Sequence, residues 1–349
     1  MSFVGPEEVN VVDVGTPDPG PTEVLVETTV SAVSAGTELL VYHGDVDAET
    51  AADETLPGLS GDLSYPLRYG YAVVGTVVEA GDAVDDRWLG ERVFGYNPHE
   101  SHFLAEPEHL LPVPDGIAPE TAALFANTET AVNFLLDGAP RIGERVAVFG
   151  QGVVGLLTTG LCAAADLDSL VAVEPHADRR AVATALGADA TVDPTATADP
   201  VTAVREASGS PERLVESDDP VPGVDLAVEV SGRPETLETA VEATRYDGRV
   251  LVGSWYGTKR AEIGLGDHYH RGRIAVESSQ VSTIAPELRG RWDRERRRET
   301  AWKRLRRLET RRDITDRLVT DTIPVSEAGR AYDRLTHEPE STLQVLLTY

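Results

Sequence analysis

A glycine motif carries the clearest chemical signal in this sequence. The heptapeptide FGQGVVG places Gly150, Gly152 and Gly155 in G-x-G-x-x-G spacing. The first glycine of such a loop allows a tight turn, the second lets a pyrophosphate approach the backbone, and the third lets helix and strand pack closely. A β-branched run precedes the loop and an apolar run follows it, so a helix N-terminus would face the anion. The motif therefore predicts a dinucleotide site that includes Val153 and Val154.

An acidic residue stands where a dinucleotide site chooses between cofactors. Glu174 closes the next strand-like run, at about the distance expected for a ribose-binding acid. Its carboxylate would accept hydrogen bonds from the ribose hydroxyls and repel a 2′-phosphate, which predicts NAD(H) as the preferred cofactor. His176, Arg179 and Arg180 follow closely, and a cation there could accommodate NADP(H) instead. The alternative for these three residues is an ordinary helix surface.

Strand and helix patterns alternate around this motif. Such alternation predicts a doubly wound parallel sheet with helices on both faces, an α/β Rossmann domain. The predicted strands are 145–149, 169–174, 190–192, 224–230 and 249–253, and the predicted helices are 153–165, 178–186 and 234–244. Residues 208–223 are rich in Gly, Pro, Ser and acid, which predicts a surface excursion.

The first third of the chain has a different pattern. Short runs that alternate or are β-branched, separated by Gly and Pro, predict an antiparallel, partly closed sheet from residues 22–34, 71–81 and 91–96. Apolar spacing over 119–138 predicts a helix, and residues 341–349 predict a last strand that returns to the first sheet.

A basic segment follows the predicted Rossmann domain. Between Arg289 and Asp313, the residues Trp302, Leu305 and Leu308 recur at helical spacing, which predicts a helix with an inward apolar stripe and outward arginines. Two interpretations remain open. The arginines form a solvated face that pairs with carboxylates, or they bind an anionic substrate or a neighbouring subunit.

The overall charge is strongly negative. The chain has 59 Asp+Glu against 31 Lys+Arg, a formal net charge of -28. Such a surface repels itself at low salt, which favours a protein adapted to molar salt over an ordinary acidic cytosolic protein. A surface of this sign disfavours a nucleic-acid partner.

Other sequence features bound the class of protein. Cys162 is the only cysteine, so we expect neither a disulfide nor a cysteine-rich metal site. The first ten residues lack the pattern of a signal peptide. Residues 146–165 are apolar enough to imitate a membrane span, but their glycines and polar residues favour a strand, a turn and a helix. We expect a cytoplasmic protein with no membrane partner.

Taken together, these segments resemble the medium-chain dehydrogenase/reductase superfamily. The matching segments are AGTE (35–38), GYAVVGTVVEAG (70–81), GERVAVFGQGVVG (143–155), DLAVEVSG (225–232) and DGRVLVGSWYG (247–257). The resemblance implies a GroES-like antiparallel β-barrel domain, formed by residues 1–136 with 285–349, and a Rossmann domain over 137–284. It also implies hydride transfer between a nicotinamide cofactor and an alcohol or carbonyl. Thr130, Ser231 and Gly253 are then further cofactor-binding positions.

The departures from this family concern zinc. Zinc-dependent members carry a Cys where this sequence has Ala35, a His-Glu pair where it has Tyr71 and Ala72, and a further ligand near Ala126. The cysteine-rich structural zinc loop is missing as well. Because a zinc site requires three or four N, S or O ligands, we expect no catalytic zinc. A zinc-lacking branch with an S-x-G-T-E segment, which includes bacteriochlorophyllide dehydrogenase-like and sugar dehydrogenase-like proteins, is similar.

Without a metal, a donor or an acid-base group must stand beside the substrate oxygen. The candidate catalytic residues are Thr37, Glu38, Tyr71, His99 and Glu129. Tyr71 takes the position of the lost histidine, where its phenol could donate a hydrogen bond. Each candidate also has a structural alternative: Thr37 and Glu38 could cap a turn, Tyr71 could fill space, and His99 could be an exposed loop residue.

Several functions remain open at this point. The first is a zinc-independent NAD(P)(H)-dependent oxidoreductase that acts on a small-molecule alcohol or carbonyl. The second is an enoyl or quinone reductase, and the third is a nucleotide-binding protein without catalysis. Members of the resembled superfamily are commonly dimers or tetramers, so a homodimer or homotetramer is expected.

Overall fold

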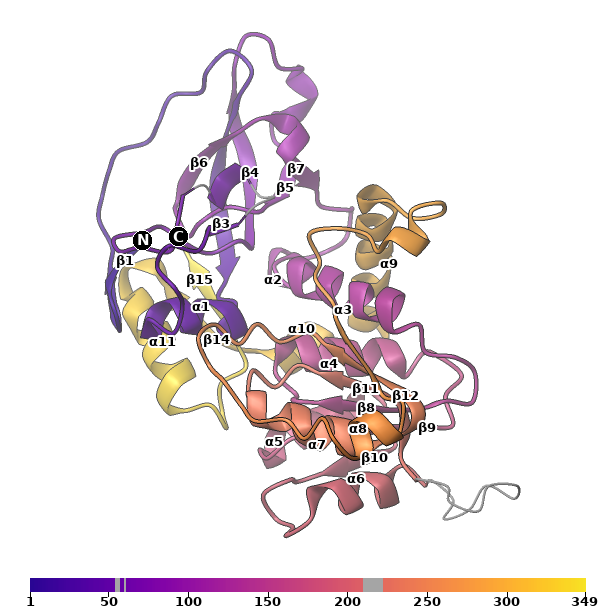
Figure 1. The fold of residues 1–349 in the computed structure, drawn as a ribbon. Helices are drawn as coiled ribbons and strands as arrows, with labels where there is room; N and C mark the ends of the chain where they lie inside the picture. The colour runs from indigo at the N-terminus through magenta and orange to yellow at the C-terminus, as the bar shows by residue number, and fades with distance from the viewer. Residues whose placement is uncertain (54–56, 60, 210–221) are drawn as a thin grey trace. The chain divides into compact units, whose positions relative to one another are not determined.

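The computed structural model describes residues 1–53, 57–59, 61–209 and 222–349 (Figure 1). Most of the surface excursion predicted over 208–223 therefore lies outside the described residues. The chain forms two units, of which unit 1 comprises Met1–Ala126 with Asp313–Tyr349 and unit 2 comprises Asn127–Arg312.

These unit boundaries differ from the expected domain boundaries at 136/137 and 284/285. Two helices account for the difference. Helix α3 (Phe125–Gly138) and helix α9 (Arg294–Arg312) are joined by a buried ion pair between Glu129 and Arg297. Both helices therefore belong almost entirely to unit 2.

Unit 1 is built on a mostly antiparallel sheet. Its hydrogen-bonded order is β14-β15-β3-β4-β5-β7, with β6 also paired to β3 and with β14 and β15 parallel. The strands of this sheet are β3 (Val24–Ala32), β4 (Val73–Ala80), β5 (Arg92–Gly95), β6 (His102–Ala105), β7 (Leu110–Pro112), β14 (Val319–Pro324) and β15 (Gln344–Thr348). A separate hairpin joins β1 (Ser2–Gly5) to β2 (Glu8–Asn10). The predicted last strand is confirmed, since Leu346 of β15 pairs with Ala32 of β3.

The helices of unit 1 are short. They are α1 (Ala35–His43), α2 (Pro119–Ala122), α10 (Ile314–Leu318) and α11 (Ala328–His337), with 3-10 turns at Pro57–Leu59, Asp86–Trp88, Pro107–His109 and Val325–Glu327. Helix α1 was missed from the sequence, although its end carries a clear signal. Gly44 has φ 74° and closes the helix in the left-handed conformation, where glycine avoids the penalty of a Cβ atom.

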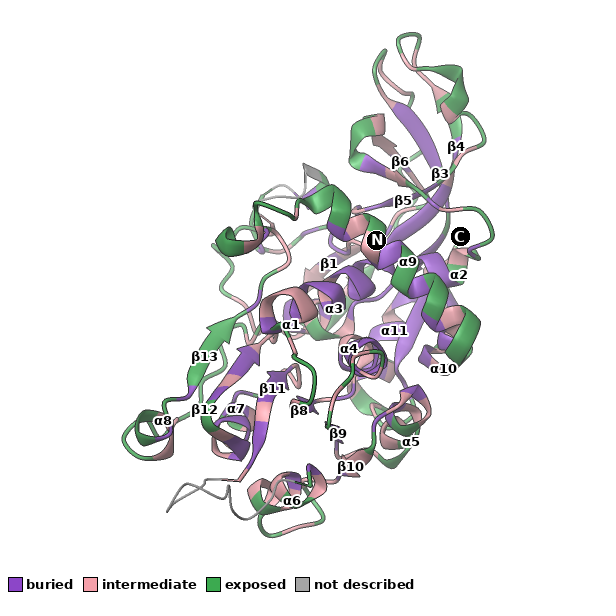
Figure 2. Cartoon of the chain, turned by 90° about the vertical axis from the view of Figure 1, so that its right-hand side faces the viewer, coloured by how far each residue is buried: buried purple, intermediate pink, exposed green. Residues whose placement is uncertain are grey.

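Unit 2 contains the predicted parallel sheet. All neighbouring strands are parallel in the order β10-β9-β8-β11-β12-β13. The strands are β8 (Arg145–Phe149), β9 (Ser169–Val173), β10 (Ala190–Val192), β11 (Val224–Glu229), β12 (Thr244–Val252) and β13 (Ala275–Ser278). Strand β13 was not predicted from the sequence, and every residue in it is exposed, as its green colour in Figure 2 shows.

Helices cover both faces of this sheet. Successive side chains of β8 point to opposite faces, and both sets are buried. Val146 and Val148 pack in the core cluster that contains Phe134 of α3 and Cys162. The intervening residues of β8 pack in the cluster on the opposite face, with side chains of α6 and α7. The remaining helices of unit 2 are α4 (Val153–Cys162), α5 (Ala177–Leu186), α6 (Pro200–Ala207), α7 (Pro234–Ala243) and α8 (His268–Arg271), with a 3-10 turn at Pro286–Leu288.

Two predicted helices have different bounds in the structure. The helix expected over 119–138 is broken into α2 and α3, and the basic helix begins at Arg294 rather than Arg289. Its predicted apolar stripe is confirmed, because Trp302, Leu305 and Leu308 are buried. No helix in the described ranges is both long and apolar enough to cross a membrane.

Candidate functional site

The glycine loop between β8 and α4 has the geometry that the sequence predicts. Gly150 has φ +94°, and a Cβ atom there would lie 2.5 Å from the Cα atom of Ser231. A Cβ atom on Gly155 would lie 2.0 Å from the carbonyl oxygen of Gly150, so only glycine lets α4 start this close to the loop. Gly150 and Gly155 therefore each meet a steric requirement.

Gly152 faces open space. It is the N-cap of α4, and no atom lies within 4 Å of where its Cβ atom would be. The N–H groups of the first helical turn, which begins with Val153 and Val154, have no intrahelical acceptors. Together with the helix dipole they form a site for an anion such as a pyrophosphate.

Glu174 lies directly after β9 and supports the loop. The residue is 3% exposed, and its Oε2 accepts a hydrogen bond from the backbone N–H of Gln151 at 2.8 Å. Its Oε1 accepts from the backbone N–H of His176 at 3.1 Å. Because a carboxylate oxygen has two lone pairs, Glu174 can still accept a further hydrogen bond from a ribose hydroxyl.

The neighbouring cations are engaged with the protein. Arg180 donates to the carbonyl oxygens of Glu174 and Pro175, both at 2.7 Å, and lies 3.0 Å from Asp193. Arg179 is half-buried, and this burial lowers the pKa of its guanidinium. Arg180 is thus a structural part of the turn after β9.

Of the three further predicted cofactor positions, one lies beside the loop, one follows β12 and one lies on α3. The backbone of Ser231 packs against Gly150, as described above. Gly253 follows β12, where a Cβ atom would lie 2.2 Å from the ring of Phe134. Thr130 is half-buried on α3. The structure therefore places Ser231 next to the glycine loop. It also explains the glycine at position 253, because a side chain there would collide with the ring of Phe134.

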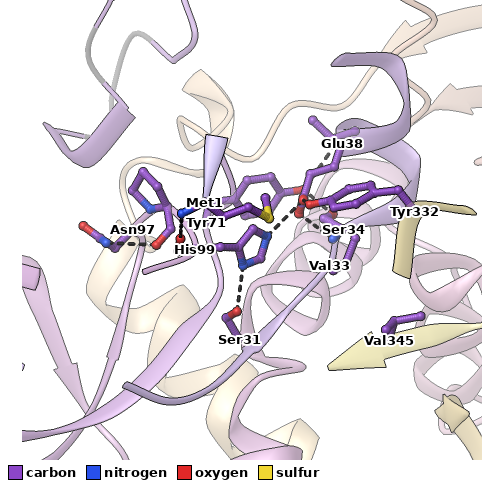
Figure 3. Close-up of polar contacts among 12 residues, drawn as sticks. Met1, Ser31, Val33, Ser34, Glu38, Tyr71, Asn97, His99, Tyr332 and Val345 are labelled. Atoms are coloured by element: carbon purple, nitrogen blue, oxygen red, sulfur yellow. Dashed lines mark hydrogen bonds and ion pairs between the residues drawn. The ribbon is translucent and has the colours of Figure 1, made fainter. Parts of the chain in front are cut away.

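Unit 1 contains a buried polar cluster centred on Glu38 (Figure 3). Glu38 and His99 are both fully buried, and Oε2 of Glu38 lies 3.0 Å from Nε2 of His99. The same oxygen accepts a hydrogen bond from the phenol of Tyr332 at 2.6 Å, and Oε1 accepts from the backbone N–H of Ser34 at 2.6 Å. Both carboxylate oxygens are therefore satisfied inside the core.

The other ring nitrogen of His99 continues the cluster. Nδ1 lies 2.7 Å from the hydroxyl of Ser31, which in turn lies 2.8 Å from the hydroxyl of Tyr349. Figure 3 shows the imidazole of His99 between Ser31 and Glu38. A Cβ atom on Gly70 would lie 2.6 Å from the imidazole, so this glycine provides the space for the ring.

A group of three hydroxyls lies at the start of α1. Tyr71 donates to Oγ1 of Thr37 at 3.2 Å and forms a short hydrogen bond with Oγ of Ser34. Tyr71 and Thr37 are partly exposed, whereas Ser34 is buried. Ser34 touches both clusters, because its N–H binds Glu38 and its hydroxyl binds Tyr71. A backbone N–H cannot pass a proton onward, so the two clusters are adjacent without forming one chain of exchangeable protons.

The pKa shifts in these clusters follow from burial and charge. Burial alone would raise the pKa of Glu38, but the charge and hydrogen bond of His99, with hydrogen bonds from Tyr332 and Ser34, lower it. Burial raises the pKa of Tyr71, although its hydrogen bonds with neighbouring hydroxyls oppose the shift. At neutral pH, Glu38 is thus a carboxylate and Tyr71 a protonated phenol.

The residues at the expected zinc positions do not fit a zinc ion. Ala35 and Ala72 have methyl side chains, which offer no ligand atom, and the carbonyl of Ala72 accepts a hydrogen bond from the N–H of Ala32. Tyr71 is engaged with its hydroxyl neighbours. Across the described part of the chain, one group of three acidic or histidine side chains could converge on a metal, and it consists of exposed residues Glu106, Glu108 and His109.

Glu129 lies in unit 2, in a different environment from the other catalytic candidates. Its Oε1 is 3.0 Å from Nε of Arg297 and 3.8 Å from Nε of Arg298. Arg297 also donates to Oδ1 of Asn133 at 2.8 Å and to the carbonyl oxygen of Val281 at 2.6 Å. This buried pairing favours a structural role for Glu129 over the predicted acid-base role.

The sequence thus located part of the unit 1 cluster. Thr37 and Tyr71 lie in one cluster and Glu38 and His99 in the adjacent one, and the partners of all four were missed. These partners are Ser31, Ser34, Tyr332 and Tyr349. Tyr332 is 294 residues from Glu38, and no local pattern connects the two positions. The nearby His102 lies on β6 and contacts Ser101 and Glu27.

Comparisons with known sequences identify several relatives. Residues 153–294 match the family model described as zinc-binding dehydrogenase. (R,R)-butanediol dehydrogenase of Bacillus subtilis is 31% identical over 247 residues, which cover 63% of this chain and 65% of the relative. The chain thus spans about two thirds of the length of the first curated relatives it matches, 65% and 66% for butanediol and D-guloside 3-dehydrogenases. The family match falls in unit 2, apart from the expected zinc positions.

Solved structures share the fold over the whole chain. The crystal structure of 2R,3R-butanediol dehydrogenase from Bacillus subtilis has a TM-score of 0.77 at 22% identity, covering 100% of this chain and 98% of that one. The structure of an alcohol dehydrogenase (rspB) from Escherichia coli CFT073, complexed with NADH, has a TM-score of 0.75 at 15% identity, with coverage of 100% and 98%. At these identities the likeness establishes the fold.

Proposed function

We propose, from the premise that this chain belongs to the medium-chain dehydrogenase/reductase superfamily, that it is an NAD(P)(H)-dependent oxidoreductase acting on an alcohol or a carbonyl. The observation that carries this proposal is the glycine loop, in which Gly150 and Gly155 meet steric requirements while Gly152 faces open space. A bound nicotinamide would accept or deliver the hydride. The chain's own residues bind the dinucleotide and manage the substrate oxygen.

Unit 2 supplies the dinucleotide site. The N-terminus of α4 would bind the pyrophosphate through backbone N–H groups, and Glu174 would accept hydrogen bonds from the adenosine ribose. A buried carboxylate at this position repels a 2′-phosphate, which supports a preference for NAD(H). The engagement of Arg180 with Asp193 and two carbonyl oxygens supports the same preference.

Unit 1 would supply the groups that replace a metal. We assign the substrate oxygen to the hydroxyls of Tyr71 and Thr37, two residues of intermediate burial whose hydroxyl oxygens lie 3.2 Å apart. The raised pKa of Tyr71 keeps its phenol protonated, so it can donate a hydrogen bond to the oxygen as negative charge develops there. This assignment makes the reaction independent of zinc.

Glu38 and His99 then act as positioning residues. They contact the hydroxyl group only through the N–H of Ser34, which transfers no proton. The carboxylate of Glu38 fixes Ser34 and the first turn of α1, and this turn carries Thr37. Three hydrogen-bonded partners in the core restrict its side chain, so the hydroxyls are held in one arrangement.

The proposed partners follow from the same site. A small molecule with an alcohol or carbonyl group is the expected substrate, and a symmetric homodimer or homotetramer is the expected assembly. The net charge of -28 supports the absence of a nucleic-acid partner.

Turnover after metal removal tests the function. The purified chain is dialysed against a chelator, its zinc content is measured, and a panel of secondary alcohols and sugars is assayed with NAD⁺ for the formation of NADH. We expect turnover that chelation does not change. Turnover that requires added zinc would refute the hydroxyl assignment, and a product with a reduced C=C bond and an intact carbonyl would indicate the enoyl reductase alternative. Tight cofactor binding without turnover would indicate a protein without catalysis.

A further inference from the structure

A second buried carboxylate lies close to the glycine loop. Glu229 is the last residue of β11 and is fully buried. Its Oε1 accepts from the N–H of Ser231 at 2.8 Å and from the hydroxyl of the same residue. Its Oε2 accepts from the phenol of Tyr256 at 2.5 Å. This carboxylate therefore joins the segment after β11 to the segment after β12.

Further hydrogen bonds connect the same two segments. The N–H of Gly232 donates to Oγ of Ser254 at 2.9 Å, and the N–H of Gly253 donates to the carbonyl oxygen of Glu229 at 2.9 Å. The Cα atom of Ser231 is the atom that a Cβ atom on Gly150 would approach most closely. The Glu229 cluster, defined as Glu229, Ser231, Ser254 and Tyr256, thus sets the position of the backbone that flanks the glycine loop.

The sheet order places this cluster on one side of the dinucleotide site. The chain runs from β8 outward to β9 and β10, and later returns to place β11 on the other side of β8. The carboxyl ends of β8 and β11 therefore form the topological switch point, where open α/β sheets bind dinucleotides. Glu174 marks the adenosine side at β9. The second nucleotide must then extend toward β11 and β12, where the Glu229 cluster lies.

We infer that Glu229 and Tyr256 are positioning residues for the nicotinamide half of the cofactor. They act through the backbone of Ser231 and Gly253, which they hold on the β11 side of the glycine loop. A carboxylate suits this role because it accepts from a backbone N–H and two hydroxyls at once. The inference depends on the proposed function, since it assumes that a nicotinamide dinucleotide binds.

Two ligands separate this role from general support of the fold. NADH occupies both halves of the site, whereas ADP-ribose lacks the nicotinamide. The dissociation constants of both ligands are measured for the wild-type chain, Tyr256→Phe and Glu229→Gln. Tyr246→Phe is the control, because Tyr246 lies in β12 of the same unit and is 53% exposed. Thermal unfolding confirms that each variant is folded.

We expect Tyr256→Phe to weaken NADH binding roughly tenfold, the effect of losing one hydrogen bond to a charged group. The affinity for ADP-ribose should stay within about twofold, and the control should match the wild type. The emission of bound NADH should shift toward that of free NADH, because its nicotinamide is less well enclosed. Glu229→Gln keeps one acceptor oxygen and should show a smaller loss of the same kind.

Three results would contradict the inference in different ways. Equal weakening of NADH and ADP-ribose in a folded variant would mean that the cluster supports the whole loop. Unchanged NADH affinity in both variants would mean that it has no role in binding. Failure of the wild-type chain to bind either ligand would instead refute the proposed function on which the inference depends.

Discussion

Tyr71 is the residue on which the proposed chemistry depends. Its phenol lies where the resemblance to zinc-dependent family members predicts a histidine ligand, and it contacts the hydroxyls of Ser34 and Thr37. A metal would supply several kcal/mol of charge stabilisation at the substrate oxygen. Two hydroxyl donors supply less stabilisation than a metal does. We therefore expect the substrate oxygen to be hydrogen-bonded to these donors while negative charge develops on it.

Removal of the phenolic hydroxyl should therefore slow turnover. We expect Tyr71→Phe to lower kcat by roughly 10²-fold, as the loss of one donor to a developing oxyanion does elsewhere, with NADH affinity unchanged. Steady-state kinetics and a cofactor titration check both values. The control is Tyr246→Phe, which removes an exposed phenol in unit 2. Unchanged kcat in Tyr71→Phe would exclude Tyr71 as a donor to the substrate.

The buried carboxylate of Glu38 should make stability depend on pH in a defined direction. Its pKa is lower in the folded chain than the ordinary value of 4.5, so ionised Glu38 stabilises the fold above that pH. This contribution is lost as the pH falls through the lowered pKa of the folded state. Glu38→Gln should reduce the free energy of unfolding at neutral pH by roughly 1–3 kcal/mol.

Denaturant unfolding at a series of pH values measures this effect. The difference in stability between the wild type and Glu38→Gln should shrink as the pH falls below 4.5. Glu8→Gln, at an exposed position on β2, should leave stability nearly unchanged. A difference between wild type and Glu38→Gln that grows toward low pH would contradict the assignment of an ionised Glu38.

At the scale of elements, local and distant contacts differ in how well they could be predicted. The glycine loop was predicted because its spacing, the positive φ of Gly150 and the contact of Gly155 with Gly150 all arise within a strand, a turn and a helix that follow one another. The cluster around Glu38 assembles residues from α1, α11 and the loop before β6, and no periodicity joins them. Helix α1 was missed because it is short and its N-cap, Ser34, makes no side-chain capping hydrogen bond.

The contact between α3 and α9 depends on Glu129, which the sequence predicted as a catalytic residue and which pairs with Arg297 in the structure. Arg297→Met should leave Glu129 buried without its closest cation and destabilise unit 2 by roughly 3–5 kcal/mol. The double variant Arg297→Met with Glu129→Gln should recover part of that loss, because no buried charge remains unpaired. Thermal and denaturant unfolding measure both.

Arg304, an exposed arginine of the same helix, provides the control for this loss of stability. Arg304→Met should change stability by less than about 0.5 kcal/mol, since Arg304 lies on the solvent face of α9. A loss in Arg297→Met no larger than in Arg304→Met would show that the ion pair has no structural weight.

At the scale of the whole molecule, charge is the dominant property. A net charge of -28 opposes compaction through repulsion that salt screens within about 10 Å at 0.1 M and about 3 Å at 1 M. Adaptation to molar salt was predicted from composition alone. Such an adaptation would depend on the summed surface charge and not on any single contact in either unit.

Salt should therefore stabilise this chain. We expect Tm to rise by several degrees or more when KCl is raised from about 0.1 M to about 2 M. An equivalent concentration of sucrose separates screening of charge from exclusion of solute. A Tm that is constant or falls with KCl would show that the acidic surface is already tolerated at low salt.

The most direct test of the account is a titration of the chain with NADH and NADPH in molar KCl, followed by tryptophan fluorescence. The account predicts saturable binding of both cofactors, with NADH tighter, and a loss of this preference in Glu174→Ala. Such a result would establish that the glycine loop and Glu174 form a dinucleotide site. If neither cofactor bound at millimolar concentration, the proposed oxidoreductase function would be contradicted.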